Sequence, residues 1–153
     1  MDTVTMHAPA TAATAGYEAL SEPLRQLEKR IRAHRAVVGV VGQGYVGFPL
    51  AQRVAEVGFP TIGFDISGAT VARCEKENRF ATYKAVRSAI HLSPCDVIII
   101  AVPTPTKEEG GRREPDLSLV IGAVQTVLLN LLDDGRARLL LLRAPTPRAR
   151  PAT

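Results

Sequence analysis

The fold of this chain is decided by the stretch Val37-Val38-Gly39-Val40-Val41-Gly42-Gln43-Gly44-Tyr45-Val46-Gly47. Its short β-branched apolar run is typical of a buried parallel strand, and the run ends in three glycines spaced G-x-G-x-x-G. In this spacing Gly42 allows a tight turn, Gly44 lets a pyrophosphate approach the backbone, and Gly47 lets the next helix pack on the strand. The helix N-terminus then offers free N–H groups and a partial positive charge to phosphates. The stretch therefore predicts a half-domain that binds a nicotinamide dinucleotide.

A glycine triplet also marks ordinary turns, so the residues that follow it matter. Residues 58–60, Gly-Phe-Pro, end the predicted helix, and a second strand over residues 61–64 leads to Asp65. Asp65 lies 18 residues past Gly47, close to the ~20 expected for the carboxylate that binds the ribose hydroxyls. A carboxylate here favours NAD, because it would repel a 2′-phosphate. The alternative is that Asp65 caps the following helix, a role that Ser67 can also fill.

The clearest strand of the chain runs from Asp96 to Val102 and is apolar after its first residue. Such a run indicates burial on both faces of a sheet. In doubly wound sheets, ligands bind beyond the carboxyl ends of the strands where the strand order reverses, and we expect this strand and the first one to flank that point. The strand ends in Pro103-Thr104-Pro105-Thr106, so two threonine hydroxyls become available to a ligand. The alternative, that the prolines only stiffen the exit from the strand, stays open.

Periodicity divides the rest of the chain. We expect a disordered leader over residues 1–16 and an N-terminal helix over residues 17–35, whose apolar stripe packs on the domain or on a sister subunit. That stripe consists of Leu20, Leu24, Leu27 and Ile31. The other expected elements are helices at 46–57, 68–78, 85–92 and 115–132, strands at 61–64, 80–83 and 137–142, and a charged surface loop at 107–113. This alternation predicts an α/β fold over residues 36–142, a doubly wound parallel sheet of the Rossmann type that is incomplete at its C-terminal side.

Composition is that of an ordinary globular domain. The chain has 153 residues, of which 46% are hydrophobic, and a net charge of +4. A chain of this length forms one domain with a true core. Arg143, Arg148 and Arg150 supply three of the four net charges, so the rest of the chain is nearly neutral. This pattern predicts no nucleic-acid partner.

The two cysteines, Cys74 and Cys95, fit neither a metal-ligand spacing nor a CxxC motif. Free thiols are typical of a reducing compartment, so we expect a cytoplasmic protein. No apolar run reaches the length of a membrane span or of a signal-peptide core. The sequence therefore predicts no metal and no membrane partner.

The chain resembles the N-terminal domain of the UDP-glucose/GDP-mannose dehydrogenase family at four motifs: Gly42-Gln43-Gly44-Tyr45-Val46-Gly47-Phe48-Pro49-Leu50-Ala51, Gly63-Phe64-Asp65, Val102-Pro103-Thr104-Pro105 and Glu114-Pro115-Asp116-Leu117-Ser118. The last motif favours the branch that oxidises UDP-N-acetylhexosamines. The resemblance covers about residues 36–142 and is specific because few Rossmann enzymes combine these motifs.

The resemblance implies a four-electron oxidation, in which the C6 alcohol of a nucleotide sugar becomes a carboxylate while two NAD molecules are reduced. In the family, a cysteine thiolate of a C-terminal sugar domain is the nucleophile that holds the intermediate. The cofactor-binding residues that the resemblance implies lie in the glycine turn, at the ribose carboxylate and at the end of the second buried strand. They are Gly42, Gln43, Gly44, Tyr45, Val46, Gly47, Asp65, Val102, Pro103 and Thr104.

Two departures from the family pattern affect these expectations. A basic residue often follows the ribose aspartate by about five positions, but Thr70 stands there and Arg73 lies one helical turn further on. The chain also stops before the sugar domain, and neither Cys74 nor Cys95 matches the catalytic cysteine. We therefore expect no catalytic residue in this chain.

The last residues suggest a reason for the short length. Where this chain has residues 143–151, the family has something like Glu-Ser-Thr-Tyr-x-Pro-Gly-Thr-Thr. Codons for Glu-Ser-Thr read one base late spell Arg-Ala-Pro, and codons for Pro-Gly-Thr-Thr read the same way spell Arg-Ala-Arg-Pro; both strings occur here in that order. One expectation is a frame slip near Leu142 that truncated a full-length dehydrogenase. The alternative is a native, disordered Arg/Pro-rich tail over residues 143–153.

Two functions are compatible with the sequence. The first is the N-terminal NAD-binding part of a nucleotide-sugar 6-dehydrogenase, which binds NAD weakly or not at all and has no activity alone. The second is a stand-alone NAD-binding module that senses the cofactor or docks on a partner, for which we expect micromolar affinity. A calorimetric titration with NAD distinguishes the two.

Overall fold

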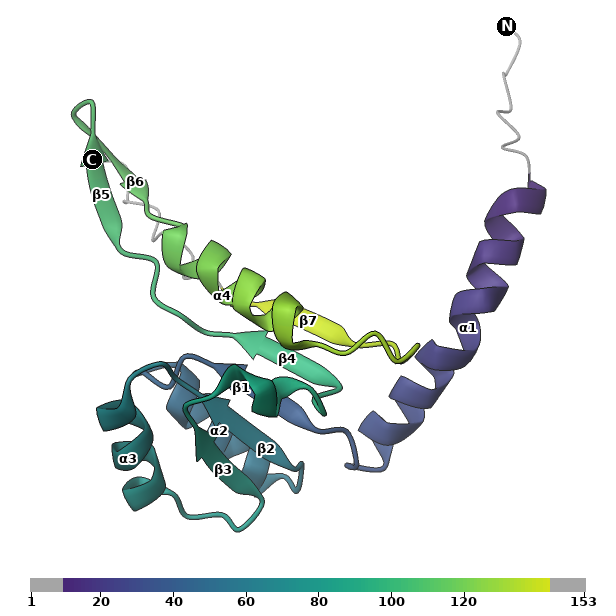
Figure 1. Ribbon diagram of the computed structural model, residues 1–153, viewed down its shortest axis with the longest axis horizontal. Helices are drawn as coiled ribbons and strands as arrows, with labels where there is room; N and C mark the ends of the chain where they lie inside the picture. The colour runs from purple at the N-terminus through teal and green to yellow at the C-terminus, as the bar shows by residue number, and fades with distance from the viewer. Residues whose placement is uncertain (1–9, 144–153) are drawn as a thin grey trace, which may run out of the picture.

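The computed structural model describes residues 10–143, with side chains from residue 21 onward apart from those of Glu109 and Arg112. Five strands form one sheet in the order β3-β2-β1-β4-β7, and every neighbouring pair is parallel (Figure 1). The strands are β1 (Val38–Val41), β2 (Thr61–Phe64), β3 (Tyr83–Val86), β4 (Val97–Ile100) and β7 (Leu139–Leu142). The predicted α/β fold with a Rossmann-type parallel sheet is confirmed.

Helices cover both faces of the sheet. Helices α2 (Gly47–Glu56) and α3 (Gly68–Glu77) pack on one face, where Phe48, Ala51 and Cys74 join the core. The 3₁₀-helix η1 (Ala89–Leu92) and helix α4 (Ser118–Asn130) pack on the other face, through Leu92 and Val127. The central strands β1 and β4 are buried on both sides, which is why their sequences are continuous apolar runs rather than alternating ones.

Strand β1 lies at the centre, where the strand order reverses. From β1 the chain proceeds outward through β2 to β3 and then returns to β4 on the opposite side of β1. Val41 is in register with Phe64 on one neighbour and with Ile100 on the other. Two hydrogen bonds continue this register past the strand ends, from Gly42 N to Phe64 O and from Ala101 N to Val41 O, both 2.8 Å. The carboxyl ends of the three central strands therefore end at one level, as expected for a ligand site.

Helix α1 (Ala10–Arg32) precedes the sheet and extends away from it (Figure 1). The helix begins at Ala10, so residues 10–16, which the sequence placed in a disordered leader, are helical here; residues 1–9 are outside the described part of the chain. Leu27 is buried in the core, and Ile31 packs beside it. Leu24 of the same predicted stripe is half exposed, so among the side chains described from residue 21 onward the contact with the domain lies in the last turns of the helix.

An ion pair joins α1 to the amino ends of the central strands. Arg30 Nη2 lies 3.0 Å from Asp96 Oδ1, although not in the orientation of a hydrogen bond. Asp96 Oδ2 accepts the backbone N–H of Val37 at 3.0 Å, and Arg136 Nη1 lies 3.7 Å from Asp96 Oδ1. The buried Asp96 carboxylate thus connects α1, β1, β4 and the segment that leads into β7.

The third strand differs from its prediction. The sequence placed a strand at residues 80–83, but β3 occupies Tyr83–Val86. The Asn78 side chain accepts the backbone N–H of Phe80 at 3.0 Å and donates to its carbonyl at 3.0 Å, so this segment is held in a turn. Because Ala85 and Val86 belong to β3, the expected helix over residues 85–92 is reduced to η1.

The predicted surface loop at residues 107–113 is wrong. Strands β5 (Thr106–Glu109) and β6 (Arg112–Pro115) form an antiparallel hairpin there. Its two connecting residues, Gly110 and Gly111, have φ angles of +60° and +77°. Positive φ at both central positions is what a tight hairpin turn requires, and glycine adopts it without strain.

Strand β7 forms one edge of the sheet, and its four leucines are each 39–59% exposed. The register with β4 places Leu140 and Leu142 on the α4 side, beside Ile98 and Ile100. An apolar edge of this kind presents unpaired backbone groups and apolar surface together. The predicted Arg/Pro-rich tail begins at Arg143, and its remaining residues, 144–153, are outside the described residues.

Candidate functional site

A pocket of about 530 Å³ opens at the carboxyl ends of β1, β2 and β4. The strand ends contribute Val41, Gly42, Phe64, Asp65, Ala101, Val102 and Pro103, together with Gly44 and Ile66 from the loops. The first turns of α4 form the facing wall through Ser118, Leu119, Gly122, Ala123 and Thr126. This volume lies in the range of small-molecule and cofactor sites, and the pocket occupies the point at which the strand order reverses.

The three glycines of the turn differ in what a side chain at each position would meet. Gly42 has φ +89°, a region that favours glycine, and a Cβ there would lie 3.0 Å from Ala101 O. A Cβ on Gly47 would overlap the carbonyl oxygen of Gly42, so α2 can approach β1 only without a side chain. A Cβ on Gly44 would meet no atom within 4 Å. Nothing in the protein itself demands glycine at position 44, so the bare backbone there leaves room for a ligand.

The start of α2 offers backbone donors beside this open space. Val46 at the N-cap provides no side-chain hydrogen bond to the helix. Within residues 10–143, no acceptor is found for the N–H groups of Gly44, Tyr45 and Val46, whereas Phe48 N donates to Gly44 O at 3.2 Å. Unpaired amides at a helix N-terminus are suited to bind an anion such as a phosphate.

Asp65 is hydrogen-bonded to the glycine turn. Its Oδ2 accepts the backbone N–H of Gln43 at 2.9 Å, and its Oδ1 accepts that of Ser67 at 2.9 Å. Ser67 is the N-cap of α3 and accepts Thr70 N at 3.2 Å, so the capping role considered for Asp65 belongs to Ser67. Each carboxylate oxygen has a further lone pair, and Asp65 is one of the residues that line the pocket.

The side chain of Gln43 points into the protein, although the sequence assigned this residue to the cofactor. It is fully buried, with Nε2 donating to Val40 O at 2.9 Å and Oε1 accepting the Tyr83 hydroxyl at 2.8 Å. Its backbone N–H is taken by Asp65. Gln43 therefore anchors the turn to the protein interior through its buried side chain, and it does not line the pocket.

The remaining predicted residues fall into two groups. Gly42, Gly44, Asp65, Val102 and Pro103 meet in the pocket. The others do not line it: Thr104 is half-buried beyond the strand end, Gly47 is packed against Gly42, Val46 is partly exposed and Tyr45 is fully exposed.

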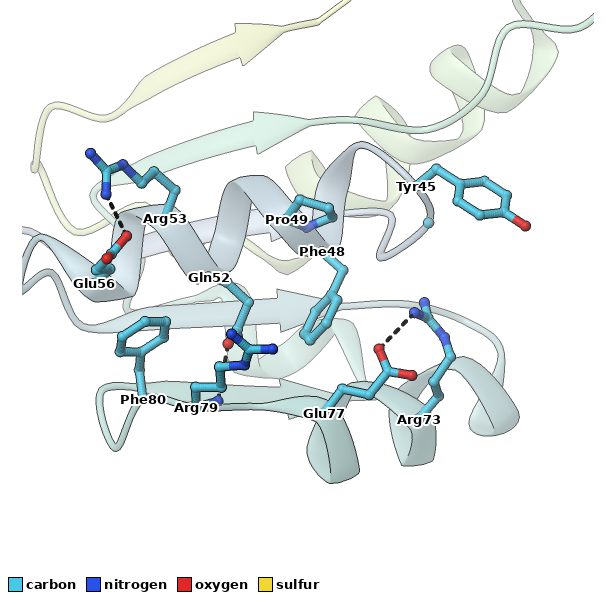
Figure 2. Close-up of a pocket in the computed structure, with 11 residues that line it drawn as sticks. Tyr45, Phe48, Pro49, Gln52, Arg53, Glu56, Arg73, Glu77, Arg79 and Phe80 are labelled. Atoms are coloured by element: carbon cyan, nitrogen blue, oxygen red, sulfur yellow. Dashed lines mark hydrogen bonds and ion pairs between the residues drawn. The ribbon is translucent and has the colours of Figure 1, made fainter.

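Tyr45 borders a second groove, of about 720 Å³, on the other side of the glycine turn between α2 and α3 (Figure 2). Two of its three arginines are already paired with glutamates, Arg53 with Glu56 and Arg73 with Glu77. The charges of the groove are thus largely compensated within the protein.

Arg73, the basic residue noted one helical turn past Thr70, contacts the glycine turn. Its Nη2 donates to the carbonyl oxygen of Gln43 at 2.6 Å. The guanidinium also lies over the Phe48 ring, 5.5 Å from the ring centroid, which is a cation–π distance. Arg73 therefore contacts both the glycine turn and the start of α2. It lines the second groove and not the pocket at the strand ends.

The α4 wall was not foreseen from the sequence. Leu119, Gly122, Ala123 and Thr126 recur at spacings of three and four residues, so they share one helix face. The small residues Gly122 and Ala123 were the only signal available, since their size permits close approach of a ligand to the helix.

The two cysteines are inaccessible. Both are fully buried, and burial raises the pKa of the Cys74 thiol and raises that of Cys95 to about 12. A thiol is a poor nucleophile in this state, because the thiolate is the reactive form. No group of three or more His, Cys, Asp or Glu side chains suited to a metal occurs among the described residues. No helix within residues 10–143 has the length and apolar character of a membrane span.

Comparison with known proteins identifies relatives that, by their names, bind NAD or oxidise UDP-sugars. Residues 37–114 match the family model described as the NAD binding domain of 6-phosphogluconate dehydrogenase. The chain is 34% identical over 102 residues to the UDP-N-acetyl-D-mannosamine dehydrogenase of Methanocaldococcus jannaschii, covering 58% of this chain and 24% of that protein. It is 31% identical over 108 residues to the enzyme of the same name from Methanococcus maripaludis, covering 61% and 25%.

Among solved structures, the UDP-N-acetyl-mannosamine dehydrogenase of Staphylococcus aureus superposes with a TM-score of 0.57 at 26% identity, covering 70% of this chain and 28% of that one. The resemblance to the N-terminal domain of the nucleotide-sugar dehydrogenases is thus confirmed. The chain spans about a quarter of the length of these relatives.

Proposed function

The chain belongs to the family of NAD-binding domains described for 6-phosphogluconate dehydrogenase, and from this premise we propose that NAD occupies the pocket between β1, β2, β4 and α4. The observation that carries the proposal is the combination at the glycine turn. Gly44, a glycine that nothing in the protein requires, lines the pocket together with Asp65. Gly44 carries the first of three consecutive unpaired amides, and Tyr45 and Val46 carry the other two.

Each part of the pocket suits one part of the cofactor. The amides of Gly44, Tyr45 and Val46 bind the pyrophosphate, since they are donors at a positively polarised helix end. Asp65 accepts the hydroxyls of the adenosine ribose through its free lone pairs, and it disfavours the 2′-phosphate of NADP by repulsion. Val102 and Pro103, which line the pocket, border the cofactor from the end of β4.

We further propose that this domain is the N-terminal, cofactor-binding part of a UDP-sugar 6-dehydrogenase. The relatives named above support the sugar class, because they are UDP-N-acetyl-D-mannosamine dehydrogenases that match over the same segment. In such a reaction NAD supplies the hydride acceptor, and the residues of this chain bind and orient it.

The described part of the chain contains no accessible thiol, because Cys74 and Cys95 are both buried. We therefore expect the 153-residue chain to bind NAD without oxidising a UDP-sugar.

Two measurements test these proposals. Isothermal titration with NAD and NADP should show binding of NAD and much weaker binding of NADP; the absence of any heat at millimolar NAD would contradict the cofactor site. Absorbance at the NADH band with UDP-N-acetylmannosamine or UDP-N-acetylglucosamine should stay constant, and robust NADH formation by the purified chain would overturn the expected inactivity. In the absence of turnover, weak NAD binding favours the dehydrogenase part, whereas micromolar affinity favours the alternative of a stand-alone NAD-binding module.

A further inference from the structure

A buried hydrogen bond crosses the sheet directly behind the glycine turn. The Tyr83 hydroxyl, from the first residue of β3, donates to Gln43 Oε1 at 2.8 Å. Strand β2 lies between β3 and β1 in the sheet, so this bond spans one whole strand to reach the turn that follows β1. Tyr83 is 5% exposed and Gln43 is 0% exposed. We call this connection the Tyr83–Gln43 strut.

The strut crosses strand β2 at Gly63, where the absence of a side chain leaves room for it. A Cβ on Gly63 would lie 2.5 Å from Gln43 Oε1 and closer still to the Tyr83 hydroxyl, so even alanine would force the two groups apart. Gly63 does not have a positive φ, and its backbone conformation does not explain the glycine. The space over Gly63 serves the strut.

With the strut, the backbone N–H, the carbonyl and both ends of the side-chain amide of Gln43 are all hydrogen-bonded. Its backbone N–H donates to Asp65, and its carbonyl accepts Arg73 Nη2 at 2.6 Å. Its side-chain amide donates to Val40 O at 2.9 Å, which fixes the Oε1 end toward Tyr83. The turn is thereby fastened to β1, β2, β3 and α3 through one residue.

Tyr83 also contacts the helix that begins at the turn. Its ring packs edge-on against Phe48, with centroids 5.8 Å apart and an interplanar angle of 70°. Phe48 belongs to the first turn of α2, directly after the amides of Gly44, Tyr45 and Val46. One side chain from β3 therefore holds both ends of the segment that carries those amides.

We propose that Tyr83 and Gln43 are positioning residues for the pyrophosphate, because the strut holds the glycine turn that leads into the unpaired amides of Gly44, Tyr45 and Val46. This inference rests on the proposed NAD site. Neither side chain touches the pocket, so their effect on the cofactor passes through the turn. Binding is weakened when donors must first be ordered, and a pre-formed turn removes that cost.

The test uses Tyr83→Phe, which keeps the ring and removes the hydroxyl, and Gly63→Ala, which keeps both polar groups and separates them. Thr61→Val is the matched control. It removes another hydroxyl from a buried residue, one that donates to Phe59 O at 2.8 Å, at the opposite end of β2. Each variant and the unchanged 153-residue chain are titrated with NAD, ADP and adenosine, and their melting temperatures are measured.

We expect Tyr83→Phe and Gly63→Ala to weaken NAD and ADP binding about tenfold while adenosine binding is unchanged, because only the first two ligands contain a diphosphate. Thr61→Val should lower the melting temperature and leave all three affinities unchanged. The proposal is overturned if Tyr83→Phe binds NAD as tightly as the unchanged chain, or if it loses affinity for adenosine and NAD equally.

Amide hydrogen exchange at residues 44–47 supplies a readout that does not need the cofactor. We expect faster exchange in Tyr83→Phe and Gly63→Ala, and no change in Thr61→Val. If the unchanged chain fails to bind NAD, the proposed function fails by itself, and the strut is then judged by exchange alone. Unchanged exchange in both variants would contradict it whatever the cofactor does.

Discussion

The carboxylate of Asp65 and the backbone N–H of Gln43 are joined by a hydrogen bond of 2.9 Å. This bond links the end of β2 to the turn that follows β1, so the group proposed to bind the ribose is fixed to the turn proposed to bind the pyrophosphate. The two halves of the proposed NAD site thus meet in one structural unit at Gln43, and the amides of Gly44, Tyr45 and Val46 lie beyond this bond.

Replacing Asp65 by asparagine should damage this unit. An amide offers one acceptor oxygen, so one of the two backbone N–H groups, of Gln43 or of Ser67, faces an NH₂ group instead. We expect NAD affinity to fall by about 1.5–3 kcal/mol, the range for hydrogen bonds to charged groups. Calorimetry measures this loss. Asp133→Asn, at an exposed position between α4 and β7, should leave the affinity unchanged, and an equal loss in both variants would point to a general effect of charge.

Two glycine substitutions should separate binding from folding. Gly44→Ala adds a Cβ that meets no protein atom, so we expect an unchanged melting temperature and an NAD affinity lowered by about tenfold, ~1.4 kcal/mol, where the methyl group obstructs the pyrophosphate. Gly47→Ala adds a Cβ that overlaps Gly42 O, so we expect a loss of folding free energy of about 3 kcal/mol or more. Thermal unfolding and NAD titration check both. Full NAD affinity in Gly44→Ala would show that the ligand does not approach this backbone.

Asp96→Ala should release α1 from the sheet. The carboxylate is 4% exposed and faces Arg30 and Arg136. Its removal leaves the partly buried Arg30 without this partner, whereas Arg136 keeps its ion pair with Asp134. Breaking a buried pair costs about 3–5 kcal/mol, and the poor hydrogen-bond orientation of Arg30 places the expected loss at the lower end. The matched control is Glu28→Ala, which breaks the exposed pair with Arg32 in the same helix and should cost about 0–1 kcal/mol. Chemical denaturation measures both, and NAD affinity should be unchanged because Asp96 lies at the amino ends of the strands.

Stability should fall in alkaline solution because of Cys95. Burial raises the pKa of this thiol from 9.0 to about 12 in the folded chain. Between these two values the unfolded chain has released the proton and the folded chain retains it, so the unfolded state binds fewer protons and each pH unit costs the fold about 1.4 kcal/mol. The contribution is fully present below pH ~9 and is lost as the pH rises toward ~12. Denaturant unfolding of the chain and of Cys95→Ala should show a shallower pH slope in the variant, and equal slopes would contradict the assignment.

The central strands and the glycine turn were predictable because each leaves a local signature. A strand buried on both faces is a continuous apolar run, as in β1 and β4, and the turn needs its glycines at fixed spacing. Strand β3 was misplaced because Tyr83-Lys84-Ala85-Val86 is short and contains a lysine. The hairpin was missed although Gly110 and Gly111 are a typical tight-turn pair, since the charged residues around them indicated a loop.

Features that depend on tertiary packing were not accessible from the sequence. The sequence does not show that Gln43 points inward, because its direction depends on Tyr83, which lies 40 residues further along the chain. The wall formed by α4 depends on how that helix docks, and spacing alone does not say which helix face meets the pocket. Arg73 was noted as a basic residue, but its bond to the Gln43 carbonyl follows from the packing of α3.

The β5–β6 hairpin leaves the end of β4 and returns to the same place, where Asp116 N donates to Pro105 O at 2.6 Å. The residues before β5 and after β6 are thus hydrogen-bonded to each other, and the tip of the hairpin projects away from the sheet (Figure 1). Extra sequence spliced between Gly110 and Gly111 would extend outward without parting β4 from α4. A fluorescent protein inserted there would stay attached next to α4, which lines the pocket. The hairpin tip is therefore a practical attachment point for a label on this domain in living cells.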